Sequence, residues 1–113
     1  MVMPAQYILR KSKNDQFYFT LTANNNEPIL SSEMYVSKAG AENGIQSVKT
    51  NSPDDSRYTR LTASNGKFYF RLKAGNNQTI GTSEMYNSEA GRDNGIEAVK
   101  KVGPTAPLSD KTE

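Results

Sequence analysis

The sequence contains neither cysteine nor histidine. Without cysteine the chain can form no disulfide framework, no thiolate metal site and no nucleophilic thiol. Without histidine it lacks the commonest general base, and the two absences together remove the usual zinc ligands. A Ser-His-Asp or Cys-His catalytic arrangement is therefore excluded. We expect a protein that is not an enzyme and that holds no cofactor or metal.

Long apolar runs and a strong charge of one sign are also missing. No stretch reaches the ~18 consecutive apolar residues typical of a membrane span. Residues 1–6 carry neither the basic region nor the apolar segment of a signal peptide. The net charge of +2 is too small to indicate nucleic-acid binding on its own. These features predict a cytoplasmic protein that does not contact membranes.

What the sequence does contain is an internal repeat. A shift of 51 residues places residues 7–53 on residues 58–104 without a gap, and 23 of the 47 positions are identical. Self-similarity at a fixed spacing indicates one structural unit that is used twice. The 113 residues suffice for one modest core, so we expect a single domain that contains both repeats.

Within each repeat the apolar spacing changes from that of strands to that of a helix. An alternating run predicts a central strand with one apolar face, and in the first repeat this face consists of Phe17, Phe19 and Leu21. A later stripe at i, i+3, i+4 and i+7 predicts a helix with Ser37 as its N-cap. In the second repeat, Asn65 and Gly66 predict a type I′ hairpin turn before the central strand.

These patterns predict an α+β fold: two tandem βββα(β) repeats forming one antiparallel sheet with two helices packed on one face. Residues 105–113 form a tail, which is either a short last strand or a frayed end, and its composition favours the frayed end. Because one chain supplies both halves, we expect a monomer. A homodimer is the alternative if an edge strand is left open.

The repeated motif also resembles a known family. Ser-Glu-Met-Tyr followed by Ser-x-Ala-Gly-x-x-Asn-Gly-Ile-x-x-Val-Lys occurs twice and is similar to the YegP-like family of small, mostly bacterial proteins. The resemblance implies units of three strands, a helix and a short last strand, joined into one antiparallel sheet with exchanged last strands. Residues 57–63 and 107–111 would then be the last strands. The resemblance implies no activity, cofactor or site residue.

The two Ser-Glu-Met-Tyr stretches allow a functional and a structural interpretation. The functional one is a pair of pseudo-symmetric sites for a polar ligand. The structural one, which we favour, is a strand-to-helix joint in which Met and Tyr pack under the helix. Ser and Glu would then hydrogen-bond backbone groups near the start of the helix. The candidate ligand contacts are Glu33, Tyr35, Glu84 and Tyr86, with Asn43 and Asn94 further along.

The outward face of the second central strand offers Tyr69, Arg71 and Lys73 as a different candidate. An aromatic ring beside cations on an open sheet can stack on bases and neutralise phosphates. The first repeat has Tyr18 in the matching place but threonines at the charged positions. Because such residues are ordinary on the wet face of a sheet, we favour a plain solvated surface.

Three functions remain after these exclusions. The favoured one is a small non-catalytic binding or interaction module whose ligand the sequence does not identify. The second is weak single-stranded nucleic-acid binding through the exposed sheet face. The least favoured is an enzyme that uses Glu33 or Glu84, which would require a deep pocket around a perturbed carboxylate.

Overall fold

The computed structural model of the protein describes residues 4–112 and confirms the α+β fold with two tandem repeats. The first repeat consists of β1 (Tyr7–Lys11), β2 (Phe17–Thr22), β3 (Pro28–Ser32) and α1 (Lys38–Asn51). A short 3₁₀ helix, η1 (Asp55–Arg57), leads into the second repeat. This repeat consists of β4 (Tyr58–Thr62), β5 (Phe68–Lys73), β6 (Thr79–Thr82) and α2 (Glu89–Val102). The last strand is β7 (Leu108–Lys111).

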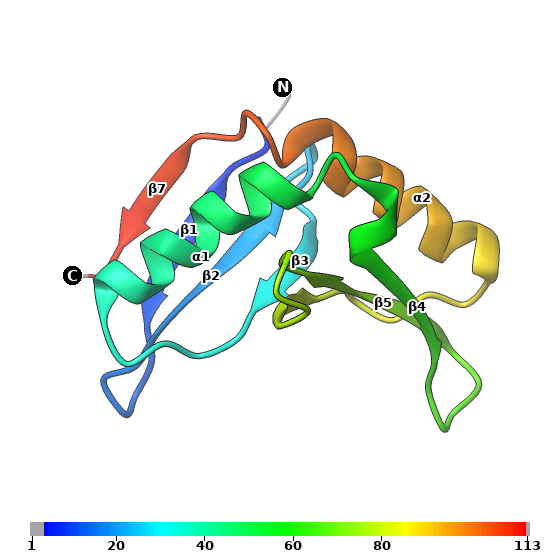
Figure 1. Ribbon diagram of the computed structural model, residues 1–113, viewed down its shortest axis with the longest axis horizontal. Helices are drawn as coiled ribbons and strands as arrows, with labels where there is room; N and C mark the ends of the chain where they lie inside the picture. The colour runs from blue at the N-terminus through cyan, green and yellow to red at the C-terminus, as the bar shows by residue number, and fades with distance from the viewer. Residues whose placement is uncertain (1–3, 113) are drawn as a thin grey trace.

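The strands form one sheet in the order β4-β5-β6-β3-β2-β1-β7. At its centre β3 pairs with β6, so that one repeat lies on each side of this pair (Figure 1). The expectation of a wholly antiparallel sheet is wrong for one pair, because β7 runs parallel to β1. Only a hairpin forces antiparallel pairing, and β7 reaches β1 after a helix.

The tail forms the short last strand and not the frayed end. After α2 the chain returns to the first repeat, where the backbone amide of Tyr7 donates to the carbonyl of Pro107 (2.8 Å). From there Leu108–Lys111 pairs with β1. A segment of the second repeat therefore completes the sheet of the first, in keeping with the exchange that the resemblance implies.

The opposite edge of the sheet, at β4, is finished differently. The segment that follows α1 becomes β4 itself, so that β4 is the last strand on its side of the sheet. The backbone amide of Tyr58, the equivalent of Tyr7, donates instead to the carbonyl of Asp55 in η1. Arg60 occupies the position of the buried Leu9 and bridges Asp55 (3.2 Å) and Asp93 (3.3 Å). A charge beside an edge strand discourages further strand pairing.

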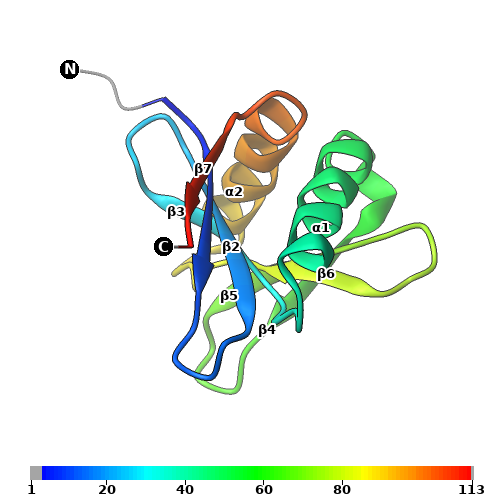
Figure 2. The same cartoon turned by 90° about the vertical axis from the view of Figure 1, so that its left-hand side faces the viewer.

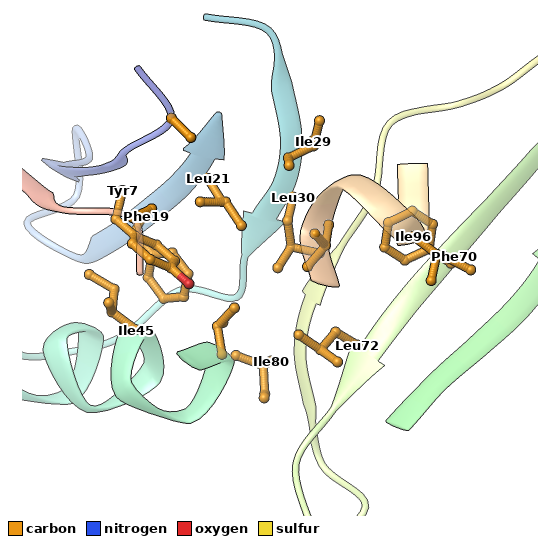
Figure 3. Close-up of a cluster of buried hydrophobic side chains, with 14 of the residues drawn as sticks. Tyr7, Phe19, Leu21, Ile29, Leu30, Ile45, Phe70, Leu72, Ile80 and Ile96 are labelled. Carbon is orange, nitrogen blue, oxygen red and sulfur yellow. The ribbon is translucent and has the colours of Figure 1, made fainter. Parts of the chain in front are cut away.

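Both helices cover the same face of the sheet (Figure 2). Their apolar stripes and the inward side chains of the strands form one buried cluster, part of which is drawn in Figure 3. The predicted strand face is correct, although Phe17 is only half-buried whereas Phe19 and Leu21 are fully buried. Fully buried side chains of both repeats include Phe19, Leu21, Val48, Phe70, Leu72, Ile96 and Val99.

The helix starts agree with the sequence, whereas one hairpin turn differs. Ser37 and Ser88 are N-caps, each accepting a hydrogen bond from the amide three residues further on (3.0 Å). The predicted type I′ turn is wrong, because Gly66 has a positive φ (83°) but Asn65 does not. The amide of Gly66 donates to the carbonyl of Ala63 (2.9 Å). The loop is therefore a type I turn closed by a left-handed glycine.

Candidate functional site

The Ser-Glu-Met-Tyr stretch joins β3 to α1 and crosses the beginning of β2. The backbone of Tyr35 pairs with that of Phe17 through two hydrogen bonds of 2.7 and 2.8 Å. The Ser32 hydroxyl accepts from the amide of Phe19 and donates to the carbonyl of Glu33, both at 2.8 Å. This serine therefore stabilises the backbone of β2 and not, as predicted, the start of the helix. The second repeat makes the same contacts.

The prediction that methionine packs under the helix is wrong. The side chains of Met34 and Met85 are 55% and 50% exposed. Neighbouring residues of an extended segment point to opposite sides, so only one of each Met-Tyr pair can face the core. The half-buried Tyr35 and Tyr86 are the residues that pack there.

Each of these tyrosines lies against a glycine of its own helix. A Cβ on Gly44 would overlap the hydroxyl of Tyr35, and it would lie 2.8 Å from Cζ of that ring. A Cβ on Gly95 would overlap the hydroxyl of Tyr86 and lie 2.7 Å from its Cζ. The Asn-Gly pair inside each helix is therefore required by the tyrosine of the Ser-Glu-Met-Tyr motif. The predicted role of these glycines, close approach at a buried helix face, is confirmed.

The tyrosine, the helix and a turn of the other repeat form a groove, which we call groove one. It has a volume of about 570 Å³. One wall comes from the first repeat: Glu33, Tyr35, Gly40, Asn43, Gly44 and Ser47. The other wall is the β5–β6 turn of the second repeat: Ala74, Asn76, Gln78, Thr79 and Ile80. Figure 2 shows this turn beside α1.

A second groove, groove two, has the same construction with the repeats exchanged. Its volume is about 400 Å³. The wall from the second repeat consists of Glu84, Met85, Tyr86, Gly91, Asn94 and Gly95. The wall from the first repeat is the β2–β3 turn: Ala23, Asn25, Glu27, Pro28 and Ile29.

The two grooves are equivalent residue by residue. Every residue that lines groove one, except Ser47, has its partner 51 positions away in the lining of groove two, which adds Met85. The main chemical difference is on the turn walls, where Gln78 of groove one corresponds to Glu27 of groove two. The pair of grooves follows from the pseudo-twofold relation between the repeats.

The phenols of the grooves report the local charge. Burial raises the pKa of Tyr35, and the nearby carboxylate of Glu33 raises it further. Burial likewise raises the pKa of Tyr86, but here the carboxylates of both Glu84 and Glu27 add to the effect. Groove two thus has two carboxylates near its phenol, one from each wall, and groove one has a single carboxylate.

The structure separates the sequence-predicted site residues into two grooves. Glu33 and Tyr35 lie together in groove one, with Asn43 beside them on α1. Glu84 and Tyr86 lie together in groove two, with Asn94 on α2. Sequence reasoning missed the turn walls, which come from the opposite repeat. The signal that could have found them is a pair of asparagines that both turns share, at 25–26 and 76–77.

The other sequence candidates, Tyr69, Arg71 and Lys73, line neither groove. The guanidinium of Arg71 lies 5.7 Å from the centroid of the Tyr69 ring, a cation–π contact. Lys73 follows an irregularity in the β5–β6 pairing and is half-buried. A base that stacked on Tyr69 would have to share this ring with the guanidinium already beside it.

The described part of the chain gives no sign of a metal centre or a membrane span. Within residues 4–112, no three side chains of Asp or Glu come together as metal ligands would. No helix in that range is long and apolar enough to cross a bilayer.

Two tandem repeats, one shared sheet and a groove at each repeat junction define the class of protein. The model of a domain of unknown function, DUF1508, matches the chain twice, over residues 12–58 and 63–110. The chain therefore belongs to the DUF1508 family.

Individual relatives confirm the resemblance to YegP-like proteins. The chain is 51% identical to the UPF0339 protein YegP of Escherichia coli (strain K12) over 110 residues, covering 97% of this chain and 100% of the relative. It is 56% identical to a UPF0339 protein of Shewanella oneidensis over 110 residues, with the same coverage of 97% and 100%. The descriptions of these proteins name no activity.

Two solved structures have the same fold. The solution NMR structure of the Shewanella oneidensis UPF0339 protein has a TM-score of 0.91 at 55% identity and covers 97% of this chain and 93% of its own. The solution NMR structure of yegP from E. coli, described as a protein of unknown function, has a TM-score of 0.92 at 50% identity. It covers 99% of this chain and 97% of its own. The similarity thus establishes the family and the fold, and the function has to be argued from the grooves.

Proposed function

We propose that the protein is a non-catalytic binding module that binds small polar ligands in its two equivalent grooves. The observation that carries this proposal is the equivalence of the grooves themselves. The lining residues of one repeat recur in the other across the turn and the helix that form the walls. The volumes, about 570 and 400 Å³, lie in the range of small-molecule sites.

The identical residues in the grooves include several that the fold does not require. Tyr35 and Gly44 are explained by their mutual packing. Glu33 and Asn43 are exposed, and exposed positions are free to vary where packing alone decides. Both nevertheless recur as Glu84 and Asn94 in the second repeat. A carboxylate and an amide at the same place in both grooves favour recognition of a polar ligand.

A binding role suits these grooves better than catalysis. Glu33 and Glu84 are exposed side chains at the rim of open grooves, whereas a catalytic carboxylate is ordinarily tuned by burial or by a close partner. The described residues also offer neither a nucleophile beside a base nor a metal centre that could supply the chemistry.

The test is an NMR screen of the ¹⁵N-labelled full chain against a library of small cationic, neutral and anionic compounds. We expect at least one class of compound to shift the amide signals of residues that line both grooves. The variant Asn43→Trp places an indole in groove one and should abolish the shifts there. The control Gln46→Trp, at an exposed position on α1 outside the groove lining, should keep them. A screen in which no compound shifts groove residues would refute the proposal.

The remaining sequence-based expectations stay predictions. These are the monomeric state, the cytoplasmic location and the alternative of nucleic-acid binding through Tyr69, Arg71 and Lys73. No contact in the structure favours that alternative over the grooves.

A further inference from the structure

The carboxylates of the grooves are distinguished from most other acidic groups by the lack of a counter-ion. Asp55 and Asp93 are ion-paired with Arg60, and Asp110 with Lys38. Within residues 4–112, by contrast, no lysine or arginine forms a salt bridge with Glu27, Glu33 or Glu84. The lining of both grooves also contains neither lysine nor arginine. The grooves thus carry negative charge that the described protein does not neutralise.

In groove two this charge comes from both walls. Glu27 lies on the β2–β3 turn of the first repeat, and Glu84 lies in the joint before α2 of the second. Tyr86 lies between them in the lining, and both carboxylates act on its phenol. A ring face and the polarisable sulfur of Met85 complete a surface that suits a cationic head group on an aliphatic chain.

We propose that groove two binds a small organic cation, an aliphatic ammonium or guanidinium, between Glu27 and Glu84, and that groove one binds the same group more weakly through Glu33. The inference rests on the proposed binding function and adds the ligand class. Charge-assisted hydrogen bonds from N–H donors to carboxylates provide the attraction. Gln78 in place of Glu27 leaves groove one with half of that charge.

The experiment compares three four-carbon probes that differ in charge: 1,4-diaminobutane, 1,4-butanediol and succinate. Each is titrated into the ¹⁵N-labelled full chain at constant ionic strength, and the amide signals of groove residues are followed. We expect saturable shifts at residues such as Gly91 and Asn94 with the diamine, and weaker binding at Gly40 and Asn43. Neither the diol nor succinate should produce them.

Charge variants test the role of each carboxylate. Glu84→Gln should weaken binding of the diamine to groove two by about three- to fivefold, the range for a partly exposed ion pair. Gln78→Glu should strengthen groove one by a similar factor. The control Asp15→Asn removes the same charge at the β1–β2 turn, away from both grooves, and asparagine tolerates the positive φ of that position (63°). It should leave both affinities unchanged.

The outcomes separate this inference from the proposed function. If the diol or succinate binds the grooves as well as the diamine, the cation inference is overturned while the binding function stands. If Asp15→Asn weakens the diamine as much as Glu84→Gln does, the attraction is a property of the whole surface and the inference is again overturned. If no probe and no library compound shifts groove residues, both fail. A blocked peptide with one lysine, titrated in parallel, distinguishes a free amine from a basic side chain by which of the two binds more tightly.

Discussion

The hydroxyl of Tyr7 donates a hydrogen bond to the carbonyl of Gly103 over 2.6 Å, between residues 96 positions apart. The equivalent hydroxyl of Tyr58 donates to the carbonyl of Ser52 over 2.7 Å. Each tyrosine belongs to the first strand of one repeat, and each carbonyl follows the helix of the other. The two bonds, both buried, therefore hold the repeats together symmetrically.

Removing one of these hydroxyls should destabilise the protein. We expect Tyr7→Phe and Tyr58→Phe each to lower the free energy of unfolding by about 1–2 kcal/mol, because a buried carbonyl loses its donor. Urea denaturation of both variants measures the effect. Tyr18→Phe, on the open face of the sheet, is the control and should change stability by less than about 0.5 kcal/mol. Equal effects at Tyr7 and Tyr18 would contradict the assigned role of the bond.

The same tyrosines predict how stability depends on alkaline pH. Burial raises the pKa of Tyr7 and of Tyr58 above the ordinary value of 10.0. Because the folded-state pKa exceeds that of the unfolded chain, the neutral hydroxyls stabilise the fold in full below pH 10.0. This contribution is lost as the pH rises above that value towards the folded-state pKa. Thermal unfolding at pH 8 to 12 should show a steep loss of stability above about pH 10, and the double variant Tyr7→Phe/Tyr58→Phe should show a shallower one.

The glycines under the groove tyrosines can be tested by adding a methyl group. Gly95→Ala should destabilise the protein by about 1–3 kcal/mol, although alanine is the better helix former, because the new Cβ overlaps Tyr86. Gly91→Ala, one turn earlier in α2, is the control. Its Cβ would come no closer than 3.3 Å to Ser88 Oγ, so a near-neutral effect is expected. The result to be feared for this explanation is equal stability of the two variants in chemical denaturation.

Much of the fold was accessible from local patterns, whereas the grooves were not. The alternation around Phe19 and the N-cap at Ser37 depend on neighbouring residues only, and both are correct. The partner of Gly44 is a tyrosine nine positions away, brought onto the helix by the tertiary fold. The groove walls depend on the pairing of β3 with β6, which places a turn of one repeat beside the helix of the other. No spacing along the chain encodes that contact.

The parallel pairing of β7 was missed for a related reason. Four residues with one apolar side chain, Leu108, carry little strand signal of their own. They form a strand because the edge of β1 lies beside them, and Asp110 is held there by Lys38. Lys38 and the Thr112 hydroxyl and amide lower the pKa of Asp110 to about 2.

The aromatic core residues of the two repeats should be of similar importance. Phe19 and Phe70 are both fully buried, and each ring makes an edge contact with a tyrosine, at centroid distances of 5.9 Å to Tyr7 and 5.7 Å to Tyr58. We expect Phe19→Ala and Phe70→Ala each to cost about 3–5 kcal/mol in chemical denaturation. Phe17→Ala, at a half-buried position, should cost clearly less. A loss below about 1 kcal/mol at Phe19 or Phe70 would mean that the ring contributes little packing.

Ser52 and Gly103 are equivalent positions that meet where the two repeats join. A Cβ on Gly103 would lie 2.6 Å from the Ser52 hydroxyl oxygen, so a side chain fits at only one of the two positions. Ser52 is fully buried, and its hydroxyl has no hydrogen-bond partner among the described residues. A buried polar group without a partner costs about 1–3 kcal/mol. Ser52→Ala should therefore stabilise the protein by about 1 kcal/mol, measured as an increase in the urea midpoint at an unchanged slope.

The control for this substitution is Ser47→Ala in the interior of α1. It makes the same chemical change at a half-buried position whose hydroxyl does accept a bond, from the side-chain amide of Asn51 (3.2 Å). The gain in helix propensity at that site, about 0.5 kcal/mol, is offset by the lost bond, so a smaller change is expected there. If Ser52→Ala instead lowers stability, the hydroxyl must contribute a bond that joins the repeats, and the join would be polar on both sides.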